Sequence, residues 1–150
     1  MKISAVIFDL FGTLVSVLPW LKHEDVVADM ARVIGAPVPE FVRLFEVDTF
    51  HDRETGVYGS VAQNITEICR RLDISPSQEC INQAADLRYR FTQQVLALRP
   101  DAFETIDSLR ECGYRIGLIS DCSPEVPSLW SQLPIAPLIP EPVFSSEVGY

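Results

Sequence analysis

The chain is poor in lysine and contains no run of basic residues. Its 150 residues carry a formal net charge of −9, and Lys2 and Lys22 are its only lysines. A nucleic-acid-binding surface needs clustered lysine and arginine side chains, so the sequence predicts no nucleic-acid partner. An anionic small molecule is not excluded, because a local pocket can be positive on an acidic protein.

Zinc-site spacing and long apolar runs are absent as well. None of the four cysteines belongs to a Cys-x-x-Cys pair, and no histidine lies near them in the sequence. This composition predicts reduced, mostly buried thiols in a cytoplasmic protein. No apolar run approaches the roughly 20 residues that span a bilayer, so no membrane partner is predicted. The N-terminus leads directly into the first predicted strand and lacks the pattern of a signal peptide.

Hydrophobic patterning predicts an α/β chain that is interrupted by a helical block. Short apolar runs rich in branched residues indicate strands, and apolar stripes at helical spacing indicate helices. Strands are expected over residues 3–8, 114–119 and 143–145, and helices over 20–34, 39–50, 61–72, 76–95, 100–112 and 124–133. Residues 51–59 contain two glycines and several charges and are expected to form a loop.

Two serines are expected to cap helices in the block. Ser60 precedes the apolar stripe of the third predicted helix. Ser75 can cap the fourth, because Pro76 suits a first helical position and Gln78 would complete a capping box.

The order of these elements predicts a parallel sheet with an insertion after its first strand. Residues 1–15 and 98–150 are expected to form the core, and residues 16–97 an all-helical cap. A block inserted at this point would lie over the carboxyl ends of the strands, where ligands bind in such sheets.

Asp9 is the first candidate for chemistry. It ends the apolar run from Ala5 to Phe8, and Gly12 and Thr13 follow at once. A carboxylate at the end of a buried strand costs free energy unless something uses it, and it can act as a nucleophile. The N–H groups of such a turn can cradle an anion. The alternative is that Asp9 only stabilises the turn.

The run Asp9-Leu10-Phe11-Gly12-Thr13-Leu14 resembles the first motif of the haloacid dehalogenase-like (HAD) hydrolases, an apolar strand followed by Asp-x-Asp-Gly-Thr-Leu. The resemblance implies a HAD-like Rossmannoid parallel sheet with an inserted helical cap. It implies that Asp9 is the nucleophile and that Leu10, Phe11, Gly12 and Thr13 contact the substrate.

The strand that ends at Ser120 resembles the second motif of the same family, which closes on Ser or Thr. In the family this hydroxyl hydrogen-bonds the group being transferred. Ser120 is therefore a second candidate catalytic residue, and Asp121 a candidate substrate-binding residue. Read without the resemblance, Ser120 is a helix or turn cap.

The third and fourth family motifs supply a lysine and acidic residues, and neither is found before the sequence ends at Tyr150. We therefore expect a C-terminally truncated sheet and poor catalysis by this chain, because a missing electrostatic donor costs roughly 100- to 1,000-fold in rate. A non-catalytic fragment or pseudoenzyme that acts by binding or oligomerising is the alternative. An unrelated α/β binding protein is a more distant one.

Phe11 stands where family phosphatases carry a second aspartate, which protonates the leaving group. A halide leaves without a proton, so Phe11 favours dehalogenase-like or otherwise atypical chemistry. The alternative is a phosphatase in which Asp9 would bind magnesium. The expected substrate is a small organic halide or phosphate ester. Arg43 and Arg53 are candidates for a halide cradle only because they fall in the expected cap, and the favoured interpretation of both is a solvated helix or loop arginine.

The absence of a further strand has a structural consequence. The strand over residues 3–8 would present an unpaired apolar edge, and such edges pair with other chains. The sequence therefore predicts a homodimer through this edge.

Overall fold

Three apolar segments form a parallel sheet in the computed structural model, which describes residues 3–16 and 20–149. The strands are β1 (Ala5–Phe8), β2 (Arg115–Ser120) and β3 (Pro142–Phe144), in the order β1-β2-β3. In the register, Phe8 lies opposite Leu118, and Ser120 lies opposite Phe144. The carboxyl ends of β1 and β2 therefore meet at one edge of the sheet, as the pattern predicted.

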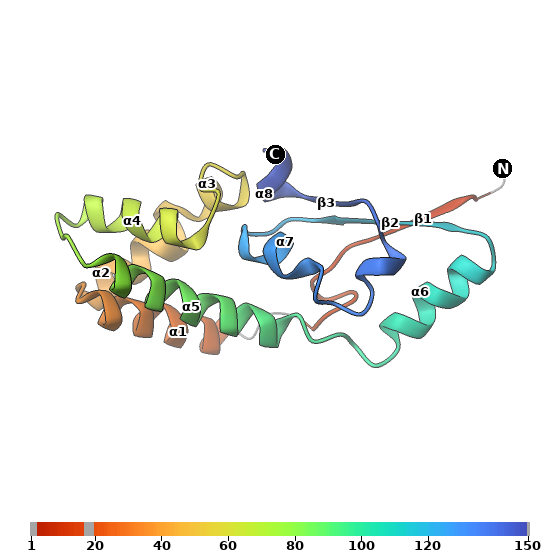
Figure 1. Ribbon diagram of the computed structural model, residues 1–150, viewed down its shortest axis with the longest axis horizontal. Helices are drawn as coiled ribbons and strands as arrows, with labels where there is room; N and C mark the ends of the chain where they lie inside the picture. Colours follow the sequence, from red (N-terminus) through yellow and green to blue (C-terminus); the bar gives the residue numbers. More distant parts are fainter. Residues whose placement is uncertain (1–2, 17–19, 150) are drawn as a thin grey trace.

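The two faces of this sheet differ sharply. Leu118 and Phe144 are buried, whereas Ile7 is 64% exposed and Ile119 is 54% exposed. Figure 1 shows α6 (Ala102–Glu111) and α7 (Glu125–Trp130) on one side of the strands. The covered face packs into a hydrophobic cluster with these helices, and the opposite face leaves apolar side chains in solvent.

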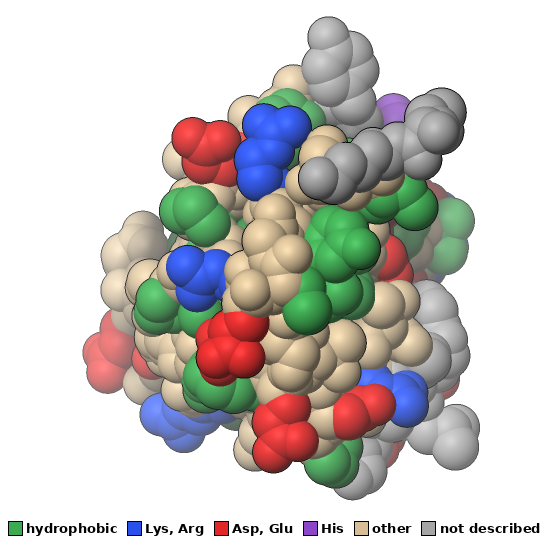
Figure 2. Space-filling model, turned by 90° about the vertical axis from the view of Figure 1, so that its right-hand side faces the viewer, with side chains coloured by type: hydrophobic (Ala, Val, Ile, Leu, Met, Phe, Trp, Pro, Cys, Tyr) green, Lys and Arg blue, Asp and Glu red, His purple; other side chains and the backbone are tan. Residues whose placement is uncertain are grey.

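β1 pairs with β2 and, in the part of the chain that the structure describes, with no other named strand. The unpaired edge expected from the sequence is therefore present. Figure 2 shows the end of the molecule beyond α6, where hydrophobic side chains are interspersed with acidic and basic ones. Association of two chains through the β1 edge stays a prediction.

The helical block lies beside the sheet and has a hydrophobic cluster of its own (Figure 1). Its helices bury Val27, Met30, Phe41 and Ile65 completely, because their apolar residues recur at helical spacing. The elements are α1 (Trp20–Ile34), α2 (Val38–Arg43), the π-helix η1 (Leu44–Asp48), α3 (Phe50–Glu54), α4 (Val61–Arg71) and α5 (Gln78–Val95). The division into core 1–15 plus 98–150 and cap 16–97 agrees with these two clusters but stays a prediction.

The start of α4 agrees with the sequence prediction, and the start of α5 differs from it. The Ser60 hydroxyl accepts a hydrogen bond from the Gln63 N–H at 3.2 Å, as expected. The cap of α5 is Ser77, which accepts from the Cys80 N–H, so the prediction of Ser75 was wrong.

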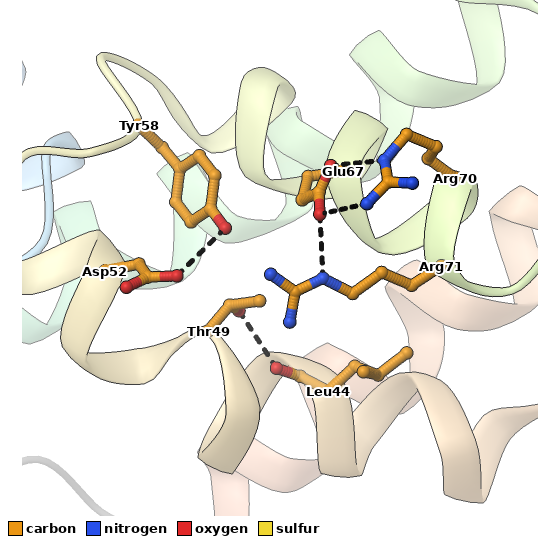
Figure 3. Close-up of polar contacts among 7 residues, drawn as sticks. All are labelled: Leu44, Thr49, Asp52, Tyr58, Glu67, Arg70 and Arg71. Carbon is orange, nitrogen blue, oxygen red and sulfur yellow. Dashed lines mark hydrogen bonds and ion pairs between the residues drawn. The ribbon is translucent and has the colours of Figure 1, made fainter.

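The segment 51–59 was expected to be a loop, but its first part is α3. Figure 3 shows two local hydrogen bonds on either side of this helix. The Thr49 hydroxyl donates to the Leu44 carbonyl at 2.9 Å, and the Tyr58 hydroxyl donates to the Asp52 carboxylate at 3.3 Å. A long-range contact also holds the helix, because the Arg53 Nε donates to the Ser123 hydroxyl; such tertiary contacts override weak helix propensity.

The C-terminal elements are short. The chain forms the 3-10 turn η2 (Ala136–Leu138), then β3, then α8 (Ser145–Val148). The loop after α3 packs against α8, and a side chain at Gly56 would collide with the Ser146 carbonyl. α8 therefore contacts both the sheet and the helical block, which a strand extending to residue 145 did not suggest.

Two expectations from composition concern the whole chain. All four cysteines are free thiols, as predicted. Within residues 3–16 and 20–149, none of the helices has the length and apolar character needed to cross a membrane.

Candidate active site

Asp9 lies directly after β1 and its side chain is exposed. The Thr13 hydroxyl donates to its Oδ2 at 3.4 Å. Gly12 adopts a φ of +76°, a conformation that other residues rarely adopt, and this allows the chain to turn back sharply. The turn is closed by N–H groups of Leu14 and Val15, which both donate to the Leu10 carbonyl. The turn thus holds the Asp9 carboxylate at the carboxyl end of β1.

Leu10 and Phe11, which were also predicted to contact a substrate, have different environments. Leu10 is fully buried in the hydrophobic cluster below the sheet, so its side chain anchors the turn. Phe11 is half-buried and lines a cavity next to the helical block. Of these residues, Phe11 is the one whose side chain faces a pocket of ligand size.

Ser120 and Asp121 end β2, beside the end of β1. Ser120 is only 1% exposed, whereas Asp121 is exposed and lines the same cavity as Phe11. Burial raises the pKa of the neighbouring Cys122 thiol to about 12, against the nearby Ser146 and Ser120 hydroxyls, which lower it. Cys122 is therefore a neutral thiol at neutral pH and a poor nucleophile.

The cavity has a volume of about 280 Å³ and lies between the helical block and the sheet. Phe11, Asp121 and residues of α7 form its wall on the sheet side. Apolar side chains from both parts face it, and buried charged groups lie among them. Its lining comprises Phe11, His23, Glu46, Phe50, Arg53, Glu54, Arg88, Thr92, Val95, Asp121, Cys122, Ser123, Glu125 and Val126. Asp9 is not part of this lining, so the cavity adjoins the Asp9 turn through Phe11.

The two arginines singled out from the sequence have different places. Arg43 is exposed and pairs with Asp48 at 2.7 Å on the surface. Arg53 is only 1% exposed and lines the cavity. Its Nε donates to the Ser123 hydroxyl at 3.1 Å, which links α3 to the loop before α7. The favoured interpretation of a solvated arginine is therefore correct for Arg43 and wrong for Arg53.

A buried ion pair that we did not predict joins α5 to α7. Arg88 Nε donates to Glu125 Oε1 at 2.6 Å, and their side chains are 7% and 1% exposed. The sequence could have revealed the burial of Arg88, because this residue continues the apolar stripe of Ile81, Ala84 and Ala85 at helical spacing. A charge on a core-facing stripe indicates a buried partner.

A second buried pair lies on the far wall of the cavity. His23 Nδ1 and Glu46 Oε1 are 3.0 Å apart, and the His23 ring also packs against Phe91 with centroids 5.6 Å apart. His23 thus has a structural role. Side chains at positions 20–22 lie outside the part of the chain that the structure describes.

Glu54 is half-buried at the end of α3 and lines the cavity. Burial, followed by the negative charge of Asp121, raises its pKa to about 7, while Arg53 opposes the shift. Glu125 adds a smaller contribution in the same direction as Asp121. The acidic Glu147 of α8, which packs on α3, is exposed.

Glu54→Gln is expected to stabilise the fold increasingly as pH rises from about 4.5 to about 7. In that window the unfolded wild type ionises Glu54 while the folded state keeps the proton, so wild-type stability falls with pH. The variant lacks this loss, and its advantage should stay constant above pH 7. Thermal denaturation from pH 4 to pH 8 measures it, with the exposed Glu111→Gln as control. Equal pH dependence of wild type and variant would contradict the assignment.

Magnesium would need oxygen ligands near Asp9. Across the described residues, no three His, Cys, Asp or Glu side chains gather into a metal-binding group. Asp9 is thus a single carboxylate without a completed donor set, and we derive no step through a metal.

Comparison with known proteins comes from solved structures, because no family model and no curated protein matches the sequence. A predicted HAD-like family hydrolase from Porphyromonas gingivalis is 23% identical over 98% of this chain and 68% of its own, with a TM-score of 0.64. The chain has a HAD-like fold. A HAD family enzyme from Bacteroides thetaiotaomicron, in complex with magnesium and inorganic phosphate, is 14% identical, with a TM-score of 0.61. That match covers 99% of this chain and 71% of the enzyme. The α/β class and the HAD-like resemblance expected from the sequence are confirmed at the level of fold.

Proposed function

We propose that the chain is a HAD-like hydrolase that uses Asp9 as a covalent nucleophile. The observation that carries this proposal is the exposed Asp9 carboxylate at the carboxyl end of β1, held by the Gly12 turn and hydrogen-bonded to Thr13. Parallel sheets bind ligands at this edge. The HAD-like fold and the adjoining cavity support the same assignment.

The reaction that best suits these residues is displacement of a leaving group that needs no proton. An Asp9 oxygen attacks the substrate carbon, a C–O bond forms, and the carbon–halogen bond breaks as halide leaves with its electron pair. Water then attacks the Asp9 carboxyl carbon, which releases the alcohol and one proton and restores the carboxylate. Phe11 offers no acid for a poorer leaving group, and its side chain instead extends the apolar wall of the cavity.

A phosphatase is the second candidate, because the Bacteroides thetaiotaomicron enzyme is described with magnesium and inorganic phosphate. In that case Asp9 would be the residue that binds magnesium and also the nucleophile. The loss of a second aspartate at Phe11 predicts slow release of an alkoxide. The third candidate function is that of a non-catalytic protein, which uses the cavity only for binding.

A panel of 2-halocarboxylic acids and phosphate monoesters distinguishes these candidates. We expect halide release from the halo acids, unchanged by EDTA, and at least about 100-fold slower release of phosphate, the factor that an absent general acid commonly costs. Halide-selective electrodes and a phosphate dye assay measure the two products. Faster, EDTA-sensitive phosphate release would support the phosphatase, and no turnover of either class would support the binding protein.

A further inference from the structure

We propose that Glu54 is the general base that activates water in the second half of the reaction. The inference rests on the proposed function, because it assigns a proton acceptor to the step in which water attacks the Asp9 carboxyl carbon. It adds a residue of the helical block to a mechanism that otherwise uses the strand ends. Phe11 cannot be this acceptor, since its side chain has no titratable group.

Glu54 lies on the helical-block side of the cavity, as the last residue of α3. The strand ends supply the opposite side, where Phe11 and Asp121 line the same cavity. Asp9 follows β1 and Asp121 follows β2, which are neighbouring strands of the parallel sheet. The negative charge of Asp121 acts on the Glu54 carboxyl group, so Glu54 lies close to the ends of these strands.

Contacts on both sides of Glu54 hold it in this position. The preceding residue, Arg53, donates from its Nε to the Ser123 hydroxyl at 3.1 Å, which ties α3 to the loop before α7. The loop that follows packs on α8, where Gly56 leaves no room for a side chain beside the Ser146 carbonyl. A catalytic group needs such fixed placement, because small displacements can cost much of the rate.

Four carboxyl groups line the cavity, and they belong to Glu46, Glu54, Asp121 and Glu125. Glu125 accepts a hydrogen bond from Arg88 at 2.6 Å, and Glu46 pairs with His23 at 3.0 Å. A neighbouring cation stabilises the charged form of a carboxylate and makes it a weaker base. Among the side chains that the structure describes, none forms a salt bridge with the half-buried Glu54. Glu54 is therefore better suited than Glu46 or Glu125 to accept a proton.

The electrostatic environment of Glu54 favours the same role. Burial and then the charge of Asp121 raise its pKa to about 7, against the opposing effect of Arg53. A general base is most effective when its pKa lies near the working pH. The charged and titratable groups on α3 and on the elements around it are His51, Asp52, Arg53, Glu46 and Asp48 of η1, Asp121 after β2, Glu125 of α7 and Glu147 of α8.

The proposed step accounts for each proton. As the water oxygen bonds to the Asp9 carboxyl carbon, one water proton passes to a Glu54 carboxylate oxygen. The tetrahedral intermediate then breaks the bond between the carboxyl carbon and the oxygen attached to the substrate. The remaining hydroxyl proton passes to this departing oxygen, so the alcohol leaves and Asp9 is again a carboxylate. Glu54 finally releases its proton to solvent.

The cavity can hold the water that this step requires. Its volume of about 280 Å³ leaves space for a small substrate beside one water, whose share of liquid volume is about 30 Å³. Phe50, Val95 and Val126 make much of the remaining wall apolar. Such walls limit the access of bulk water, so the proton acceptor has to come from the protein.

Glu54→Gln should separate the two halves of the reaction. The variant should release one equivalent of halide from a 2-halocarboxylic acid at the wild-type rate, because the displacement needs no base. Turnover after this burst should be slower by about 100- to 10,000-fold, the range typical of a lost general base. Rapid-quench halide measurement detects the burst, and mass spectrometry should find the ester on Asp9 accumulating in the variant. The exposed Glu40→Gln should behave as wild type.

The pH profile of kcat is a readout that a structural role would not change. Wild-type kcat should rise with pH and level off above an apparent pKa of about 7, because the base must be ionised. This rise should disappear in Glu54→Gln and persist in Glu54→Asp, which keeps a carboxylate. Asp121→Asn should move it to lower pH, since the charge that raises the Glu54 pKa is removed.

The same measurements distinguish the two ways in which the inference can fail. A burst and an Asp9 ester in both wild type and Glu54→Gln, with equal turnover, would overturn the assignment of Glu54 and leave the covalent mechanism intact. The absence of a burst and of an Asp9 ester from the wild type would overturn the covalent mechanism, and the role of Glu54 with it.

Discussion

Asp9→Asn is expected to abolish turnover of whichever substrate the panel identifies, with kcat lower by about 10⁴- to 10⁶-fold, the range typical of a lost nucleophile. An amide oxygen is a far weaker nucleophile than a carboxylate. The fold should persist, because Asp9 is exposed and its side-chain hydrogen bond from Thr13 is long at 3.4 Å.

Steady-state halide or phosphate release measures this loss. The matched control is Asp86→Asn, an equally conservative change at an exposed position of α5. Mass spectrometry of the wild type quenched during turnover should detect an adduct on the peptide that contains Asp9. Retention of more than a tenth of wild-type activity in Asp9→Asn would refute the covalent mechanism.

Glu125→Gln is expected to destabilise the fold by about 3–5 kcal/mol, the usual cost of removing one partner from a buried ion pair. Glu125 is fully buried, and it is the carboxylate that pairs with Arg88 between α5 and α7. Its removal leaves Arg88 and Arg53 close together with no directly bonded counter-charge. Urea denaturation followed by circular dichroism gives the free energy of unfolding.

Two controls separate the buried charge from the loss of a contact. Replacing both partners by apolar residues, as in Arg88→Met with Glu125→Leu, should recover most of the lost stability, because no charge is then left unpaired. Breaking the exposed Arg32–Asp29 pair by Asp29→Asn should cost less than about 1 kcal/mol. A Glu125→Gln variant as stable as wild type would show that water or rearrangement compensates the arginines.

Local patterns were sufficient for much of the architecture. The strands end within a residue or two of the predicted positions, since branched apolar runs bounded by glycine and polar residues have few other stable conformations. Helix α1 has the predicted bounds, 20–34, because its apolar stripe ends at Gly35. The turn at Gly12 was equally visible, since glycine readily adopts the positive φ that the turn requires.

Features that depend on contacts between distant parts of the chain were harder to predict from the sequence. Helix α3 and the short α8 hold each other and the loop at Gly56, over about 90 residues of sequence. The hydrogen bond from Arg53 Nε to the Ser123 hydroxyl joins positions 70 residues apart. Each involves a free energy that no window of neighbouring residues contains.

The sequence by itself determined the parallel sheet, the helical insertion and the position of Asp9 at a strand end, because periodicity and glycine turns are local properties. Only the tertiary structure decided that Arg53 is buried while Arg43 is solvated, and that Arg88 meets Glu125 across 37 positions. An arginine has the same propensities in either place. Its environment is set by which helices pack together, and the chemistry of the cavity therefore became visible only in three dimensions.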